Sequence, residues 1–295
     1  MQAAHDPDRE RASRAFDTAL FAHVRFALSN KVRAWVMGLT FGIFNGAPER
    51  AALEVRRHYR QLTRYAAAFA WLADVSMLVL GGSLKRREKL SARLGDILSQ
   101  LYLASCVLKR YEEDGRQRED LPFVEWALQD TGHRIEEAFD GVLANYPSRF
   151  IALLLRLTIF PLGRHARPPA DQLGSAIAHA LTAPSAQRDR LTALMHLPTD
   201  ESEPLAILEA ALLASVEAEK IEALIRTAQK AGKLAAPADA LADAALAAGL
   251  ISTDDHALLA RAAALRAEVI RVDHFPPDLG ASDLKPAGVT QRQAA

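Results

Sequence analysis

Long apolar stripes of helical period run through the first half of the chain and constrain its fold more than any other feature. From Pro48 to Leu80, and again from Ser83 to Gly115, apolar side chains recur every third or fourth position. No stretch shows the strict alternation of a strand. Each amphipathic helix must bury its apolar face against a neighbour, so the pattern predicts an all-α fold.

Glycine and proline residues separate the predicted helices. Gly81 and Gly82 end one helix, Gly115 ends the next, and Pro147 interrupts the pattern again. The predicted helices of this region are Asp8 to about Phe44 with a break near Ser29 and Asn30, Pro48 to Leu80, Ser83 to Gly115, Leu121 to Tyr146, and Phe150 to Phe160. Short turns between long helices are typical of an antiparallel bundle.

Composition shifts after the fifth predicted helix. "PLGRHARPPADQ" is rich in proline and charge, and shorter, alanine-rich helical segments follow it. These are predicted near Leu173 to Leu181, Gln187 to His196, Pro204 to Ala231, Ala238 to Ala248, and Thr253 to Ile270. We therefore expect a helical bundle over residues 1–162, a smaller helical C-terminal extension over 163–275, and a flexible tail over 276–295.

Charge and cysteine content limit the classes of partner. Lys plus Arg equals Asp plus Glu at 36 each, so the chain as a whole has no electrostatic attraction to nucleic acid. The single cysteine, Cys106, excludes an internal disulfide, and we expect it to be a small core residue. The charged N-terminus is unlike a secretory signal. These features favour a cytoplasmic location.

No uninterrupted apolar run reaches the roughly 20 residues that a membrane-spanning helix needs. The nearest, "FIALLLRLTIF", is interrupted by Arg156. With its flanking arginines, the segment 149–167 could instead lie on the inner face of the cytoplasmic membrane. The alternative is a buried helix of the bundle.

The search for catalytic and metal-binding motifs finds none. Glu-x-x-His, the signature of a di-iron bundle, does not occur, and the spacings of Glu54 with His58 and of His133 with Glu136 and Glu137 lack partners. Walker loops, dinucleotide fingerprints and nucleophile elbows are also missing. We therefore predict no catalytic and no metal-binding residue, and leave cofactor-binding residues unassigned.

Glu125, in "LPFVEWALQD", is the first carboxylate to consider as a general base. A helix could turn it toward the core, where desolvation would raise its pKa. The competing interpretation is that this glutamate is solvated or paired, as glutamates at the edge of an apolar stripe usually are.

A basic run also stands out, and we call the segment Lys85–Arg93 the basic corner. It holds five positive residues and one negative residue, an excess of four. If a helix begins at Ser83, these charges lie beside its free N–H groups, where anions bind. CoA phosphates, lipid head groups and an acidic redox partner are candidate ligands, and a solvated hairpin end is the alternative.

The basic corner belongs to a longer stretch, "LGGSLKRREKLSARLGDILSQLYLASCVLKRYEEDG", which resembles the C-terminal region of the large bacterial acyl-CoA dehydrogenases of fatty-acid β-oxidation. The resemblance continues in "ALSNKVRAWVMGLT", "QLTRYAAAFAWLADVSMLVLGG", "DLPFVEWALQD", "IFPLGRH", "EPLAILEAAL" and "VDHFPPDL". These segments extend from Ala27 to Leu279, in order. The residues Arg93, Leu94, Gly95, Asp96, Leu101 and Tyr102 also resemble a helix in the C-terminal domain of very-long-chain acyl-CoA dehydrogenases.

The resemblance implies part of a flavoenzyme. In this family a glutamate removes the α proton of a fatty acyl-CoA, FAD accepts the β hydride, and an electron-transferring flavoprotein reoxidises the flavin. Nothing in this chain matches the family's catalytic motif, so no catalytic or FAD-binding residue is transferred. We interpret the six residues from Arg93 to Tyr102 as architecture, with an Arg93–Asp96 ion pair and a close helix approach at Gly95.

Two functions remain from the sequence. The first is the C-terminal helical part of an acyl-CoA dehydrogenase that forms trans-2-enoyl-CoA, with FAD bound mainly outside this chain. The second is a non-catalytic helical module for docking or membrane contact. Homo-oligomers are compatible with both. The sequence leaves open the acyl chain length, the oligomeric state, the role of the basic corner, and whether the chain is a fragment or a subunit.

Overall fold

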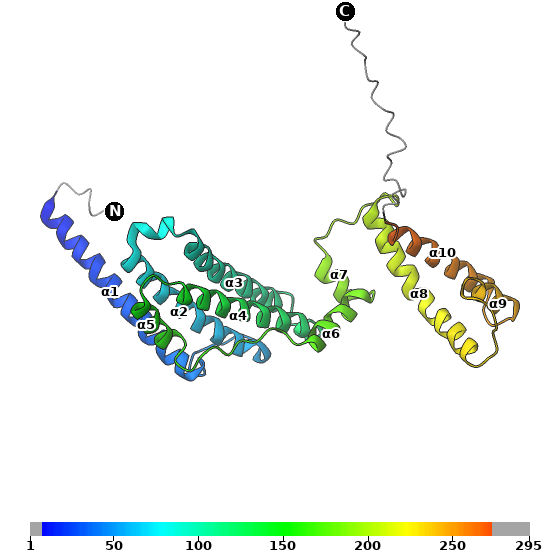
Figure 1. The fold of residues 1–295 in the computed structure, drawn as a ribbon, viewed down its shortest axis with the longest axis horizontal. Helices are drawn as coiled ribbons and strands as arrows, with labels where there is room; N and C mark the ends of the chain where they lie inside the picture. The colour runs from blue at the N-terminus through cyan, green and yellow to red at the C-terminus, as the bar shows by residue number, and fades with distance from the viewer. Residues whose placement is uncertain (1–7, 273–295) are drawn as a thin grey trace, which may run out of the picture. The chain divides into compact units, whose positions relative to one another are not determined.

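A computed structural model describes residues 8–272 of the chain, and within them it contains ten α-helices and no strand (Figure 1). This confirms the all-α fold. The chain divides into two compact units, residues 1–179 and 180–295. The predicted tail, 276–295, lies outside the described residues, and the predicted boundary at 162 stays a prediction.

The first unit is a bundle of long helices. Its helices are α1 (Arg9–Thr40), α2 (Arg56–Leu80), α3 (Glu88–Glu113), α4 (Leu121–Ala144) and α5 (Arg149–Ile159), and α6 (Asp171–Thr182) begins at its end. α1 packs against α2, α2 against α3 and α3 against α4, while α5 contacts both α1 and α4 (Figure 1). Each of the first four helices therefore buries its apolar face against the next along the chain.

The core of this bundle lies where α2, α3 and α4 meet. Tyr65 and Leu72 of α2, Ile97 of α3, and Ile135 and Phe139 of α4 are all almost fully buried. The ring of Phe139 also makes an edge-to-face contact with Phe160, at 5.6 Å between centroids. This cluster connects α5 to the bundle through the residue that ends it.

The ends of the helices follow the predicted glycines, with one exception. Gly81 ends α2 with a positive φ of 49°, and Gly115 follows α3 with φ 86°. α2, however, begins at Arg56 instead of Pro48. The backbone N–H of Ala52 donates to Glu112 of α3 (2.9 Å), and this contact holds the preceding residues as a loop.

The first helix is continuous, so the predicted break near Ser29 and Asn30 is wrong. Asn30 lies within α1 and its side chain is buried against the bundle. The opposite side of α1 carries large apolar side chains that stay exposed, including Phe21, Leu28 and Trp35. α1 therefore has one packed face and one apolar face without a neighbour among the described residues.

The apolar stripe of α3 is narrower than its sequence indicates. Leu90, Ile97 and Leu108 are buried, Leu94 and Leu101 are half-buried, and Leu98 is 56 % exposed. Cys106 is exposed, so its predicted core position is wrong. Helical period locates the centre of such a stripe, but its edges depend on how close the neighbouring helices come.

One helical segment, Leu53–Arg86, is long and apolar enough by composition to cross a membrane. This corrects the expectation that 150–160 is the nearest candidate. The most apolar window of the segment has a mean hydropathy of 1.6, and 28 % of that window is buried inside the protein. Core helices of bundles have the same composition. Because Tyr65, Ala68 and Leu72 pack into the core, we assign α2 to the bundle.

The second unit is smaller and rich in alanine. It contains α7 (Ala186–Thr192), α8 (Pro204–Lys230), α9 (Leu241–Ala247) and α10 (Thr253–Val269). α8 and α10 pack along each other, and small residues such as Ala218 and Ala262 are fully buried between them. α10 begins with a capping box between Ser252 and Asp255. α7 is joined to α8 by hydrogen bonds from Arg188 to Glu209.

Two adjacent residues of α3 test the packing of the bundle. Ile97→Ala should lower the free energy of unfolding by about 2 to 5 kcal/mol, because Ile97 is fully buried. Leu98→Ala, the matched control, should change it by about 0.5 kcal/mol or less, since that side chain is exposed. Urea unfolding followed by circular dichroism measures both. Equal losses would mean that α3 is rotated relative to the structure.

Candidate functional site

Polar side chains from distant parts of the chain meet in a hollow of about 460 Å³ on the first unit. We call it the arginine pocket. Its charged and titratable side chains are Arg57, His58 and Arg64 of α2, Glu125 of α4, and His165 and Arg167 of the segment after α5. Phe41, the residue that ends α1, lies at its edge.

Glu125, the carboxylate selected from the sequence, is paired in this pocket. One of its oxygens accepts a hydrogen bond from Arg57 and lies 3.0 Å from His58 Nε2. The other accepts from Gln129, one turn later on α4, at 2.5 Å. The sequence places Arg57 and His58 almost 70 positions from Glu125, and the packing of the bundle brings them together.

These contacts reverse the expected change in the basicity of Glu125. Partial burial alone would raise its pKa, but hydrogen bonds from Gln129, Arg57 and His58 and the charge of His58 outweigh burial and lower the pKa. The predicted rise is therefore wrong, and the paired interpretation holds. A carboxylate with a lowered pKa is a weak proton acceptor, which makes Glu125 a poor general base.

His58 is the buried partner in this group, with 6 % of its surface exposed. Burial lowers the pKa of His58, although Glu125 acts in the opposite direction. The imidazole is therefore held neutral in the folded protein at pH values where an exposed histidine begins to gain a proton.

Glu136 holds the wall of the pocket in place. Its carboxylate is 1 % exposed and accepts hydrogen bonds from the Tyr65 hydroxyl (2.9 Å) and from the backbone N–H groups of His165 (2.9 Å) and Ala166 (3.0 Å). The burial and nearby negative charge raise the pKa of Tyr65. The segment 165–166 is thus fastened to α2 and α4 through one carboxylate.

Phe41 adds an unusual backbone conformation at the edge of the pocket. It lies in the left-handed region with φ 51°, which is uncommon for a residue with a side chain. Its ring makes an edge-to-face contact with His165 at 4.9 Å, and the guanidinium of Arg64 lies 5.8 Å from its centroid. Strained conformations of this kind cluster at functional sites.

The basic corner has a different structure from the one expected. Ser83 does not begin a helix: residues 81–86 form a short 3₁₀ helix, and α3 starts at Glu88. Lys85 and Arg86 lie in the last turn of the 3₁₀ helix, where positive charge is favourable. A hollow of about 490 Å³ is lined by the segment from Arg86 to Leu90, by Arg93, and by Asn145 and Pro147. All four lysines and arginines from Lys85 to Lys89 are exposed, so the role of the corner stays a prediction.

The residues that resemble the very-long-chain enzymes show two departures. Arg93 donates to the carbonyl of Lys89 (3.3 Å) and passes over Gly141 of α4, where an added Cβ would lie 2.8 Å from its Nε. Among the ion pairs of the described residues, none joins Arg93 to Asp96. Gly95 faces open space, so the predicted close helix approach at this residue is wrong, and it is Gly141 whose missing side chain leaves room for Arg93.

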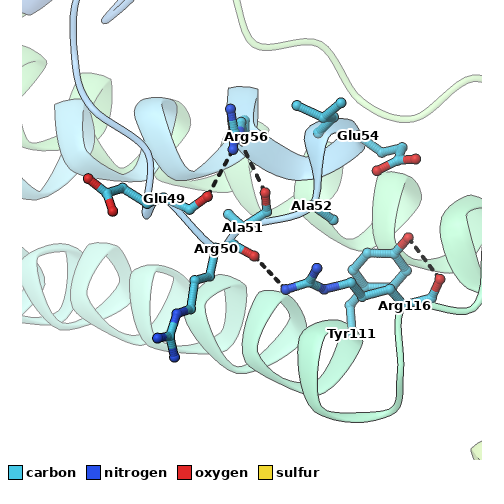
Figure 2. A pocket seen from close by; sticks show the side chains of 9 residues that line it. Glu49, Arg50, Ala51, Ala52, Glu54, Arg56, Tyr111 and Arg116 are labelled. Carbon is cyan, nitrogen blue, oxygen red and sulfur yellow. Dashed lines mark hydrogen bonds between the residues drawn. The ribbon is translucent and has the colours of Figure 1, made fainter.

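A third hollow, of about 640 Å³, lies between the loop before α2 and the end of α3 (Figure 2). Two of its arginines donate hydrogen bonds to the backbone of the loop. Arg56 donates to the backbone carbonyls of Glu49 (2.9 Å) and Ala51 (3.1 Å), and Arg116 donates to that of Arg50. We interpret this hollow as architecture, because the guanidinium groups of Arg56 and Arg116 already bond to the backbone of the loop.

The metal-like spacings found in the sequence do not converge. Glu54 is exposed before α2 while His58 turns to Glu125, and Glu136 faces Tyr65 while His133 lies 3.5 Å from Glu137. Within residues 8–272 no three potential metal ligands form a group.

The sequence did not reveal Arg57, Arg64 and His165 as residues of the arginine pocket, or the role of Glu136, since no local motif marks them.

The pKa of His58 predicts how stability depends on pH. Because its pKa is lowered in the folded protein, the unfolded chain binds the proton at a higher pH than the folded chain does. The contribution of His58 to the free energy of unfolding is therefore fully present above pH 6.5 and is lost as the pH falls below it. His58→Gln should reduce the loss between pH 7 and pH 5, measured as urea midpoints. The matched control His196→Gln removes an exposed histidine and should leave the profile unchanged. An unaltered profile in His58→Gln would contradict this assignment.

The family described as "Acyl-CoA dehydrogenase, C-terminal, bacterial type" matches residues 1–275, which include the first unit and most of the second. No solved structure matches the chain. The match agrees with the resemblance in the segments from Ala27 to Leu279. The chain belongs to the bacterial-type acyl-CoA dehydrogenase C-terminal domain family.

Proposed function

We propose that this chain is the C-terminal helical part of an FAD-dependent acyl-CoA dehydrogenase that oxidises medium- or long-chain fatty acyl-CoA to trans-2-enoyl-CoA in β-oxidation. An electron-transferring flavoprotein reoxidises the flavin, and the reaction takes place in the cytoplasm. The family match over residues 1–275 carries the proposal.

Two carboxylates, Glu125 in the arginine pocket and Glu136 behind its wall, support a catalytic glutamate outside this chain. Oxidation needs a base at the α carbon and a flavin at the β carbon, both held in place. Glu125 is paired with Arg57 and has a lowered pKa, and Glu136 is occupied by three hydrogen-bond donors. Neither is free to accept a proton from a substrate.

Three hollows of the described residues do not fit the ring of a flavin. The isoalloxazine ring needs an apolar slot, as flat cofactors generally do, whereas the arginine pocket, the basic corner and the loop hollow are each lined by several arginines. We therefore assign no flavin-binding residue in these hollows and propose that FAD is bound mainly by a core outside this chain.

Purification of the 295-residue chain tests this proposal. The protein should be colourless and should not reduce a dye with palmitoyl-CoA, while co-expression with a flavin core of the same family should give both the flavin absorbance and activity. The Glu125→Gln variant, combined with that core, should keep its activity because Glu125 is not the base. Flavin absorbance and dye reduction by this chain alone would overturn the proposal.

A second function, membrane contact or docking without redox chemistry, is favoured by α5. Ala152, Leu155 and Ile159 face the bundle, while Phe150 (77 % exposed) and Leu157 (54 %) face outward. The helix is thus both a buried bundle helix and a source of exposed apolar surface. Of the arginines proposed to meet lipid head groups, Arg156 is paired with Asp140, and Arg149 and Arg167 are exposed.

Vesicle flotation tests this contact. The chain should float with anionic phosphatidylglycerol vesicles, and Phe150→Glu should abolish binding because it places a charge in the apolar patch. Leu194→Glu is the matched control, since Leu194 is an exposed leucine of the second unit. Absence of flotation, or equal loss in both variants, would rule out a membrane role for α5.

Self-association belongs to the same proposal. The exposed apolar face of α1, with Phe21, Leu28 and Trp35, supports it, because exposed apolar surface of this extent commonly marks an interface.

A further inference from the structure

Arg64 is a buried cation with an unpartnered donor nitrogen. Only 5 % of its surface is exposed, and its buried Nη2 has no hydrogen-bond partner. Its guanidinium carbon lies 5.7 to 5.8 Å from the ring centroids of Phe41, Tyr65 and Phe160. Aromatic faces attract the positive charge, but they leave the N–H donors in the plane of the guanidinium without acceptors.

The two carboxylates of this region do not neutralise Arg64. Glu125 is bonded to Arg57 and Gln129, and Glu136 to Tyr65 and the backbone of 165–166. A buried charge without a counter-charge is strongly unfavourable, and such groups are normally paired. The arrangement therefore indicates that a negative group from outside the chain completes the pairing.

The arginine pocket has the charge and size for such a group. Arg64 lines it together with Arg57 and Arg167, and the one carboxylate among the lining side chains is Glu125. Three guanidinium groups and one carboxylate leave an excess of two positive charges, histidines not counted. The hollow, of about 460 Å³, is within the usual range for sites that hold small molecules.

We propose that the arginine pocket binds a phosphate group, with Arg64 as the buried anchor and Arg167 as the contact at its rim. The planar fork of an arginine matches two oxygens of a phosphate at once, which makes the pair both strong and directional. A phosphate dianion neutralises the excess of two charges, whereas a single carboxylate leaves one. The three aromatic rings fix the guanidinium before the ligand arrives.

Calorimetric titration of the full chain with inorganic phosphate, at constant ionic strength in sodium chloride, tests this site. Phosphate should bind saturably and raise the melting temperature, whereas sodium acetate at the same ionic strength should bind more weakly. Adenosine 3′,5′-bisphosphate then distinguishes the source of the group: tighter binding than phosphate indicates a phosphomonoester ligand, and equal binding indicates free phosphate.

Three variants locate the binding. Arg64→Gln should weaken phosphate binding by about tenfold or more, the typical effect of a lost charged hydrogen bond, without lowering the melting temperature in chloride. A purely structural arginine would instead lower it. Arg167→Gln should weaken binding with unchanged melting in chloride, and it decides the outcome if Arg64→Gln does not fold. Arg86→Gln, in the basic corner, is the matched control and should bind phosphate normally.

Three results would contradict the proposed phosphate site. Phosphate binding no stronger than that of acetate would overturn the proposal. So would binding that survives both Arg64→Gln and Arg167→Gln, or binding that only Arg86→Gln abolishes, since the last result would place the anion at the basic corner.

Discussion

Burial of Tyr65, Ile97 and Phe139 between α2, α3 and α4 is the interaction on which the rest of the first unit depends. Once these side chains are packed, the rotation of each helix about its axis is fixed. Glu136 of α4 then faces Tyr65 of α2, and Glu125 faces Arg57 and His58. The polar contacts of the pocket therefore follow from the apolar packing. Each contact joins two helices, and the buried apolar side chains set how these helices are rotated toward each other.

The packing of the bundle leaves the basic corner exposed to solvent and buries Arg64. The basic corner holds a high density of charge, but its lysines and arginines are exposed and solvated, and water screens them. Arg64 is a single charge surrounded by aromatic rings, where screening is weak and a counter-charge matters much more. A run of basic residues can be recognised in the sequence, whereas the burial of a single arginine can be recognised only in the structure. The less conspicuous arginine is therefore the stronger candidate for binding.

The sequence predicted the helices well, since period and glycine punctuation are local signals. It predicted the edges of the stripes poorly: Leu98 and Cys106 are apolar by composition but have no neighbour in the first unit to cover them. It identified Glu125 as notable and failed to find its partners, which lie on another helix. It gave no sign of Arg64, because an arginine in an apolar helix usually extends its charge to solvent. Family membership came from the resemblance over many segments, not from any catalytic motif.

Glu136 has a consequence for how the chain exchanges its amide protons with water. The segment after α5 is irregular, and irregular segments normally exchange quickly. The N–H groups of His165 and Ala166 are exceptions, because both donate to a carboxylate that is itself buried against Tyr65. Their exchange requires the segment to detach from Glu136, so both amides should be protected although they lie in an irregular segment, and their exchange reports the opening of this contact.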